Sequence, residues 1–107
     1  MKFCDDIPES VTVIKEATFA GASHLTKVSM HGNVTSIGDY AFYECSSLTS
    51  IDIPDSVTTI GERAFSDCDN LTLVNIGNGV TSIGERSFYE CVGITTLTIG
   101  TSVTDIG

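Results

Sequence analysis

The sequence has few basic residues and lacks any long apolar run. Lysine and arginine together number 5, against 14 aspartate and glutamate residues, which gives a formal net charge of −9 at pH 7. Nucleic-acid phosphates are bound by clustered lysine and arginine, so this composition argues against a nucleic-acid partner. No stretch approaches the roughly 20 apolar residues that span a bilayer, and Asp5 and Asp6 come before any apolar signal segment could form. We therefore expect no membrane insertion by this segment.

The spacings of common catalytic and metal-binding motifs are also missing. His24 and His31 are the two histidines, and neither belongs to a Cys₂His₂ or H-E-x-x-H pattern. Gly77 and Gly79 begin a G-x-G sequence, but Ser82 stands where a dinucleotide-binding motif has its third glycine. A nucleophile, a base and an orienting group cannot be assembled from hydroxyl-rich turns and two histidines. We expect a protein that is not an enzyme and that has no cofactor and no metal.

The chain instead carries a repeating 23-residue pattern. A fixed period of about 20 to 29 residues is typical of leucine-rich-repeat solenoids, in which each repeat buries its apolar face by stacking on its neighbours. Seven positions of the repeat stay apolar or small, and we predict that they form the core. These columns are Val11, Val34, Val57, Val80 and Val103; Ile14, Ile37, Ile60, Ile83 and Ile106; Phe19, Phe42, Phe65 and Phe88; Leu25, Leu48, Leu71 and Ile94; Val28, Ile51, Val74 and Leu97; Ile7, Met30, Ile53, Ile76 and Ile99; and Ala22, Cys45, Cys68 and Cys91.

Each repeat is predicted to form two strands and a turn. Residues 48–53 have the L-x-x-L-x-L spacing of a short parallel strand with alternating inward side chains, followed by turn residues. The β-branched segment 57–60 predicts a second, shorter strand on the opposite side. In 62–68, Phe65 and Cys68 would both point inward from a single helical or 3₁₀ turn.

The predicted fold is therefore a repeat solenoid of short parallel β-strands joined by turns and single helical or 3₁₀ turns, with a second short strand per repeat. We expect one domain over 1–107, made of about four 23-residue repeats and the start of a fifth, with 1–6 as a non-repeat segment. Glycine follows the second strand at Gly38, Gly61, Gly84 and Gly107, where we expect a sharp bend.

One repeat pattern is carried by residues 53–61, then Ala64, Phe65, Cys68, Leu71 and Thr72. This repeat resembles the BspA-like class of leucine-rich repeats over residues 7–107. The resemblance implies a bacterial or protist surface or secreted protein that adheres to host or extracellular-matrix proteins, and it supplies no catalytic residues. Lys15 in place of glycine, Ala22 in place of cysteine and Ser87 in place of alanine are local departures.

Three cysteines share one inward column. Stacked neighbours lie about 4.8 Å apart with parallel side chains, whereas a disulfide needs Cβ atoms roughly 3.8 Å apart. We therefore expect Cys45, Cys68 and Cys91 to be buried free thiols. Cys4 is expected to lie outside the register and to be the one reactive thiol.

Acidic residues and threonines also form columns. Calcium binding by the acidic columns is one alternative, but Arg63 and Arg86 follow two of the carboxylates and no EF-hand is present, which favours a solvated acidic edge. The threonine columns are expected to make backbone hydrogen bonds. The acidic columns are Asp39, Glu62 and Glu85, and Glu44, Asp67 and Glu90 with Asp69 beside them; the threonine columns are Thr12, Thr35, Thr58, Thr81 and Thr104, and Thr26, Thr49, Thr72 and Thr95.

The outward positions of the main strand are the candidate partner-binding face. Four strands give a sheet about 20 Å across. The area of such a sheet falls short of the roughly 800 Å² per partner that a standard interface buries. Tyrosines on the turn surface, favoured at interaction hot spots, would add to it. The candidate residues are Lys27, Ser29, Ser50, Asp52, Leu73, Asn75, Thr96 and Thr98 on the strands, and Tyr40, Tyr43 and Tyr89 on the turns.

The sequence stops in the middle of a repeat, which predicts an uncapped C-terminal end. Phe88, Leu97 and Ile99 would be partly exposed there beside an unpaired strand edge, so we expect end-to-end or swapped homodimers of this fragment. The function expected is a non-enzymatic protein-protein interaction or adhesion module of a longer cell-surface or secreted protein. The alternatives are an intracellular, cytoplasmic scaffold and a calcium-dependent binding protein.

Overall fold

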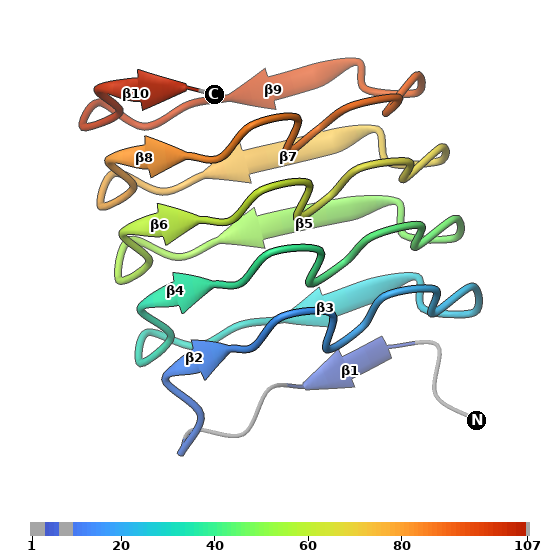
Figure 1. The fold of residues 1–107 in the computed structure, drawn as a ribbon, viewed down its shortest axis with the longest axis horizontal. Helices are drawn as coiled ribbons and strands as arrows, with labels where there is room; N and C mark the ends of the chain where they lie inside the picture. Colours follow the sequence, from blue (N-terminus) through green and yellow to red (C-terminus); the bar gives the residue numbers. More distant parts are fainter. Residues whose placement is uncertain (1–3, 7–9, 107) are drawn as a thin grey trace.

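The computed structural model describes residues 4–6 and 10–106 and shows a stack of coils that follow one another along the chain (Figure 1). Each coil contributes a longer strand on one side and a two-residue strand on the other, and the described residues contain no helix. The longer strands are β1 (Cys4–Asp6), β3 (Lys27–Ser29), β5 (Ser50–Ile53), β7 (Leu73–Ile76) and β9 (Thr96–Thr98). The short strands are β2 (Val13–Ile14), β4 (Ser36–Ile37), β6 (Thr59–Ile60), β8 (Ser82–Ile83) and β10 (Asp105–Ile106).

All strand pairs are parallel and follow the 23-residue register. Ile51 pairs with Val74 and Ile37 with Ile60, for example, so equal positions of successive repeats lie side by side. The short strands form one sheet in the order β10-β8-β6-β4-β2. This sheet confirms the predicted second strand.

The longer strands form two sheets, β1-β3 and β5-β7-β9, so the expected continuous four-stranded sheet is divided. One backbone bond still crosses the division, from Thr49 N–H to the Thr26 carbonyl (3.2 Å). Between β5 and β7, Gly77 N–H donates to the Ile53 carbonyl (2.9 Å). Pro54 occupies the equivalent position directly after β5 and has no N–H, so the matching bond to the preceding coil cannot form.

Cys4 lies in the 23-residue register, contrary to the expectation from sequence. It pairs with Lys27 at the start of β1, followed by the pair Asp5 and Val28. The pairing is not visible in the apolar column, because Asp5 stands where later repeats have valine, isoleucine or leucine. Backbone pairing does not depend on the side chain. The side chain of Cys4, the turn at 8–9, Ile7 and Gly107 lie outside the described residues, so the expectations for them stay predictions.

The predicted columns form the core. Within the central repeats, Val57, Phe65, Leu71 and Val74 are completely buried. The rings of the phenylalanine column stack face to face at centroid distances of 5.1, 5.0 and 5.2 Å, close to the spacing of hydrogen-bonded strands. The last members of some columns, such as Ile106, are exposed.

An eighth buried column was not included in the predicted core. It contains Ala41, Ala64 and Ser87. The hydroxyl of Ser87 donates to the carbonyls of Gly84 (2.6 Å) and Gly61 (3.1 Å), so this buried polar group is hydrogen-bonded.

The segment 62–68 forms successive turns and does not continue as a helix. Ser66 N–H donates to the Arg63 carbonyl (3.2 Å), as in a 3₁₀ turn, but Phe65 N–H donates across to Ser87 of the next coil (2.7 Å). This alternation needs left-handed residues, and Arg63 and Asp67 have φ values of 53° and 63°. Phe65 and Cys68 still point inward as predicted, because both are completely buried.

The recurring glycines allow close approach between coils. A Cβ at Gly84 would lie 2.6 Å from the backbone nitrogen of Glu62 in the preceding coil. Gly84 has no left-handed φ, so the sharp bend expected from sequence is not the reason for glycine. Lys15 occupies the equivalent position after β2, which is the edge strand of its sheet among the described residues.

Candidate functional site

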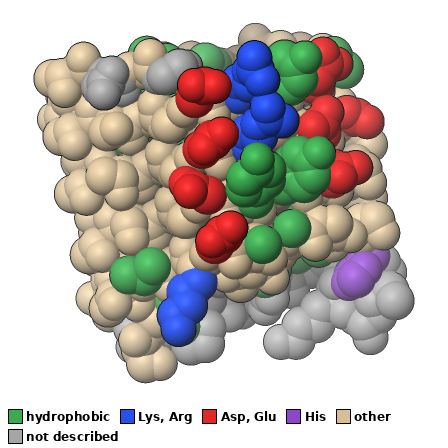
Figure 2. Space-filling model, viewed as in Figure 1, with side chains coloured by type: hydrophobic (Ala, Val, Ile, Leu, Met, Phe, Trp, Pro, Cys, Tyr) green, Lys and Arg blue, Asp and Glu red, His purple; other side chains and the backbone are tan. Residues whose placement is uncertain are grey.

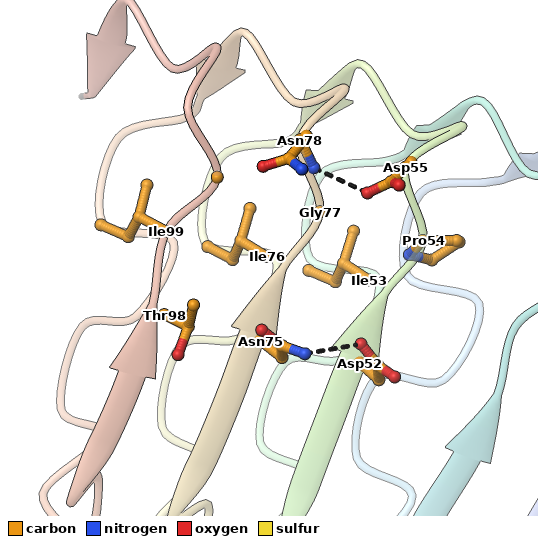
Figure 3. Close-up of a pocket in the computed structure, with 11 residues that line it drawn as sticks. Asp52, Ile53, Pro54, Asp55, Asn75, Ile76, Gly77, Asn78, Thr98 and Ile99 are labelled. Carbon is orange, nitrogen blue, oxygen red and sulfur yellow. Dashed lines mark hydrogen bonds between the residues drawn. The ribbon is translucent and has the colours of Figure 1, made fainter.

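A shallow groove of about 400 Å³ crosses the carboxyl ends of β5, β7 and β9 (Figure 3). Asp52, Asn75 and Thr98 form a row along one side of this groove, one from each strand. The Nδ2 of Asn75 donates to Oδ1 of Asp52 (3.3 Å). The row therefore combines a carboxylate, an amide and a hydroxyl at the spacing of the strands.

A second polar row follows the turn after each strand. Oδ1 of Asp55 accepts a hydrogen bond from Asn78 N–H (2.8 Å), and Oδ1 of Asn78 accepts one from Thr101 N–H (3.2 Å). Between the two rows lie Gly77 and Gly100, where a Cβ would collide with the backbone of the preceding coil. The two side-chain caps and the closely stacked glycines hold the groove in one shape.

Leu73 is the apolar feature of the same sheet. It lies on β7 between Ser50 and Thr96 of the neighbouring strands, and its side chain is 45% exposed. The structure therefore brings together six of the eight predicted strand residues. Lys27 and Ser29 are exposed as well, but they lie on β3, in the other sheet of long strands.

The three tyrosines lie on the turns, among other side chains. Tyr40 and Tyr43 contact each other edge to face (ring centroids 5.3 Å apart) and are half-buried, whereas Tyr89 is 48% exposed. The guanidinium carbon of Arg86 lies 5.5 Å from the centroid of the Tyr89 ring. The carboxylate of Glu44 raises the pKa of Tyr43, with burial and Asp67 adding to the effect. The surroundings of the Tyr43 phenol are therefore electrostatically negative.

We use the name turn surface for the tyrosines, arginines and acidic columns of these turns. Figure 2 shows two rows of acidic side chains on this face, with basic and apolar side chains between them. Ser66 lies in the column of Tyr43 and Tyr89 but is completely buried, which sequence reasoning missed. The turn surface consists of Glu16, Asp39, Glu62 and Glu85 in one row, Glu44, Asp67 and Glu90 with Asp69 in the other, and Tyr40, Tyr43, Tyr89, Arg63 and Arg86 between them.

The three cysteines of the inward column are free thiols, as predicted, with Cys45 and Cys68 buried and Cys91 half-buried. Each thiol donates to the carbonyl of a phenylalanine in the preceding coil. Side-chain hydrogen bonds with Cys45 and Cys91, together with burial, raise the pKa of the Cys68 thiol. The column thus acts as a set of hydrogen-bond donors. The bonds run from Cys45 to Phe19 (3.2 Å), from Cys68 to Phe42 (3.2 Å) and from Cys91 to Phe65 (2.9 Å).

The threonine columns make the backbone hydrogen bonds predicted for them. Thr35 Oγ1 donates to the Thr12 carbonyl (3.0 Å), and Thr72 Oγ1 donates to the Thr49 carbonyl (3.1 Å). The same bond recurs in the other repeats. These hydroxyls therefore link one coil to the next.

Among the side chains that the structure describes, no three His, Cys, Asp or Glu residues are grouped so that they could hold a metal ion. Over the described part of the chain there is also no helix that could cross a membrane.

Parallel strands with a 23-residue repeat and inward leucine-type columns define a leucine-rich-repeat protein. Residues 5–107 match the family model of the BspA type leucine rich repeat region, in 6 copies. The chain belongs to this family, which confirms the resemblance seen in its sequence. No curated protein matches the chain.

Solved structures of similar fold come from several bacteria. A leucine-rich repeat protein from Bacteroides ovatus is 39% identical with a TM-score of 0.75, and the match covers 77% of this chain and 21% of that protein. A leucine rich cell surface protein from Faecalibacterium prausnitzii is 28% identical with a TM-score of 0.71, covering 98% of this chain and 38% of that one. A pneumococcal vaccine antigen is 22% identical with a TM-score of 0.79 and shows the same fold. The match covers 98% of this chain and 26% of that protein. This chain therefore spans well under half the length of these proteins.

Proposed function

We propose that the chain is a non-enzymatic protein-interaction module that binds through the sheet β5-β7-β9. The observation that carries this proposal is Leu73, an exposed leucine at the centre of a polar sheet beside a preformed groove. Exposed apolar side chains surrounded by polar ones are typical of interaction sites. The groove adds hydrogen-bonding groups at fixed positions, which would give the contact its specificity.

The setting we propose is adhesion, as part of a longer surface or secreted protein. Support comes from family membership and from the similarity to a cell surface protein of Faecalibacterium prausnitzii. An intracellular scaffold would use the same face. The complete reading frame distinguishes the two, because a signal peptide and an anchor support adhesion and their absence supports a scaffold.

The test is surface plasmon resonance of this protein against a panel of purified extracellular-matrix proteins. We expect micromolar binding to at least one of them, and we expect Leu73→Glu to weaken it by about tenfold or more, because a buried hot-spot contact contributes about 2 kcal/mol. Val13→Glu is the matched control, since Val13 is 44% exposed on β2 in the opposite sheet. Equal binding by the two variants, or no binding to any protein of the panel, would contradict the proposal.

We also propose that this chain self-associates through its C-terminal end. Val92, Leu97, Ile99 and Ile106 are exposed there, and β9 and β10 are the last strands of their sheets. Light scattering of the unmodified protein at high concentration should give a mass above the 11.3 kDa of one chain. The Leu97→Lys variant should give the mass of a single chain. A monomer in the unmodified protein would exclude this association.

A further inference from the structure

The groove across the carboxyl ends of β5, β7 and β9 carries polar atoms that have no partner within the described part of the chain. In the first row these are Oδ2 of Asp52, Oδ1 of Asn75 and the hydroxyl of Thr98. In the second row they are Oδ2 of Asp55 and the Nδ2 group of Asn78. Both rows therefore offer hydrogen-bond acceptors and donors to a ligand.

The fold holds these atoms at fixed positions. The amide of Asn75 is oriented by its bond to Asp52 (3.3 Å), and Oδ1 of Asn78 accepts a backbone N–H of the next coil (3.2 Å). Between the rows the groove is lined at Gly77 and Gly100, which have no side chain to cover the backbone (Figure 3). Glycine allows a ligand to approach the backbone closely, so one ligand can contact both rows.

The composition of the groove lining excludes several classes of ligand. The described residues that line it include no lysine, arginine or histidine, and the carboxylates of Asp52 and Asp55 repel anions, which disfavours phosphates and acidic ligands. The same lining has no aromatic ring on which a nucleobase could stack. Pro54 is half-buried and Ile99 is 43% exposed, so apolar contact is limited to these two side chains. The ligand that fits is polar and not anionic.

The free polar atoms favour hydroxyl groups over an amine. A protonated amine donates hydrogen bonds and accepts none, so it would leave the Nδ2 donors of Asn78 without a partner. A hydroxyl group donates and accepts at once. A neutral ligand with many hydroxyl groups therefore matches both the free carboxylate oxygens and the free amide donors.

The polar groups also repeat along the groove. Asp52, Asn75 and Thr98 are paired positions of β5, β7 and β9, so they follow one another at the strand spacing of about 4.8 Å. One sugar ring lengthens a linear glycan by a similar distance, which places successive rings beside successive coils. The groove volume of about 400 Å³ lies within the range of ordinary ligand pockets.

We propose that the groove binds a neutral, linear glycan whose rings lie across β5, β7 and β9. The sugar hydroxyls donate to Asp52 and Asp55 and accept from Asn78, and the C–H faces of the rings contact Pro54 and Ile99. This inference rests on the proposed function. It names what the partner presents to the groove, a glycan next to the protein surface that contacts Leu73.

The test is an NMR titration of the ¹⁵N-labelled protein with cellohexaose, mannohexaose and chitohexaose. We expect at least one of them to shift the amides of Gly77, Asn78 and Gly100 and to saturate with a Kd of about 1 mM, because the groove is shallow. A hexamer of galacturonic acid is the charged control and should cause no shift at these amides. No binding of any neutral hexasaccharide, or equal binding of the acidic one, would overturn the proposal.

Two threonines of β9 provide matched variants. Thr98→Val removes a hydroxyl from the groove and should weaken glycan binding about fivefold, because a hydrogen bond to the sugar is lost. Thr96→Val makes the same change on the same strand, at an exposed position outside the groove, and should bind within about twofold of the unmodified protein. Asn75→Ala should weaken binding about tenfold, since its amide both donates and accepts. Equal effects of the two threonine variants would contradict the assignment, and circular dichroism melting shows whether each variant is folded.

The glycan proposal and the sheet proposal fail separately. Leu73 does not line the groove, so Leu73→Glu should bind the hexasaccharide within about twofold of the unmodified protein. Loss of matrix-protein binding in Leu73→Glu, with no glycan binding by the unmodified protein, would leave the sheet proposal standing and remove this one. If Asn75→Ala weakened binding to a matrix protein whose glycans had been removed enzymatically, the groove would hold a peptide and the glycan assignment would be wrong.

Discussion

At the scale of single residues, the cysteine column shows how burial controls the reactivity of a thiol. Cys68 is completely enclosed, donates to the Phe42 carbonyl and has a raised pKa. The thiolate is the reactive form of cysteine, so burial and a raised pKa both suppress reaction. Cys91, in the last complete repeat, is half-buried.

We therefore predict unequal thiol reactivity in a Cys4→Ser background, which leaves the three column thiols. Cys91 should react with iodoacetamide at least about tenfold faster than Cys68 in the folded protein, because reaction follows exposure and thiolate content. Peptide mass spectrometry over a labelling time course measures the rates. All three should react at similar rates in denaturant, and similar rates in the folded protein would contradict the prediction.

Left-handed residues are a second feature at this scale. Glu44 has a φ of 56°, and Gly21 holds the same position in the first repeat with a φ of 75°. A non-glycine residue in this conformation costs about 1–2 kcal/mol, and glycine loses about 0.5–1 kcal/mol through its greater freedom in the unfolded chain.

Glu44→Gly should therefore raise the free energy of unfolding by about 0.5 kcal/mol, the difference between these two effects. Glu44→Val should lower it by about 1 kcal/mol or more, because a β-branched residue tolerates this conformation poorly. Urea denaturation of the two variants measures both changes. If the Glu44→Val and Glu44→Gly variants were equally stable, the left-handed conformation would not determine the stability effect of substitutions at this position.

At the scale of elements, the contact between coils is made by glycine. Gly84 packs so closely on the preceding coil that a Cβ would lie 2.6 Å from the Glu62 nitrogen, a backbone atom that cannot turn aside. We predict that Gly84→Ala destabilises the protein by about 1–3 kcal/mol through this overpacking.

Lys15→Ala is the matched control for this change, because Lys15 holds the same repeat position at the edge strand and is exposed. It should alter stability by less than about 0.5 kcal/mol, as surface substitutions generally do. Thermal unfolding of the two variants checks the difference. Two equal effects would show that close approach does not explain the glycine column.

Most of the elements were predictable, and the exceptions have identifiable causes. The apolar columns predicted β5, β6 and their equivalents because inward side chains repeat with the backbone. The register of β1 was hidden by Asp5, and the division between β3 and β5 involves Pro54, which lacks a donor. The candidate residues on β5 and β7 occupy outward positions of these strands. The groove was not foreseen, since its shape depends on backbone contacts at Gly77 and Gly100.

At the scale of the whole molecule, the strands of each coil, over the residues that the structure describes, contact only strands of the neighbouring coils. The central columns are completely buried, whereas their last members are partly exposed. Stability in such an array is approximately a sum of repeat and interface contributions, so coils with one neighbour are weaker than coils with two.

We predict that amide hydrogen exchange follows this order. Amides of β5, β6 and β7 should exchange slowest, and those of β9 and β10 faster by about tenfold or more, because the terminal coil opens without disturbing the centre. Exchange mass spectrometry at peptide resolution tests this directly. Uniform protection along the chain would indicate a single cooperative unit or a covered C-terminal end.

The amino-acid pattern was enough to establish the period, seven of the eight core columns, the two strands of each repeat and the family. It was enough because stacking coils of equal length places equal positions in register, so the side chains alone reveal the repeat. The pairing of β1, the division of the long strands, the left-handed columns and the bonds from the thiols to phenylalanine carbonyls required the folded coordinates. These features depend on where backbone N–H and C=O groups meet across coils, and side-chain patterns do not record that geometry.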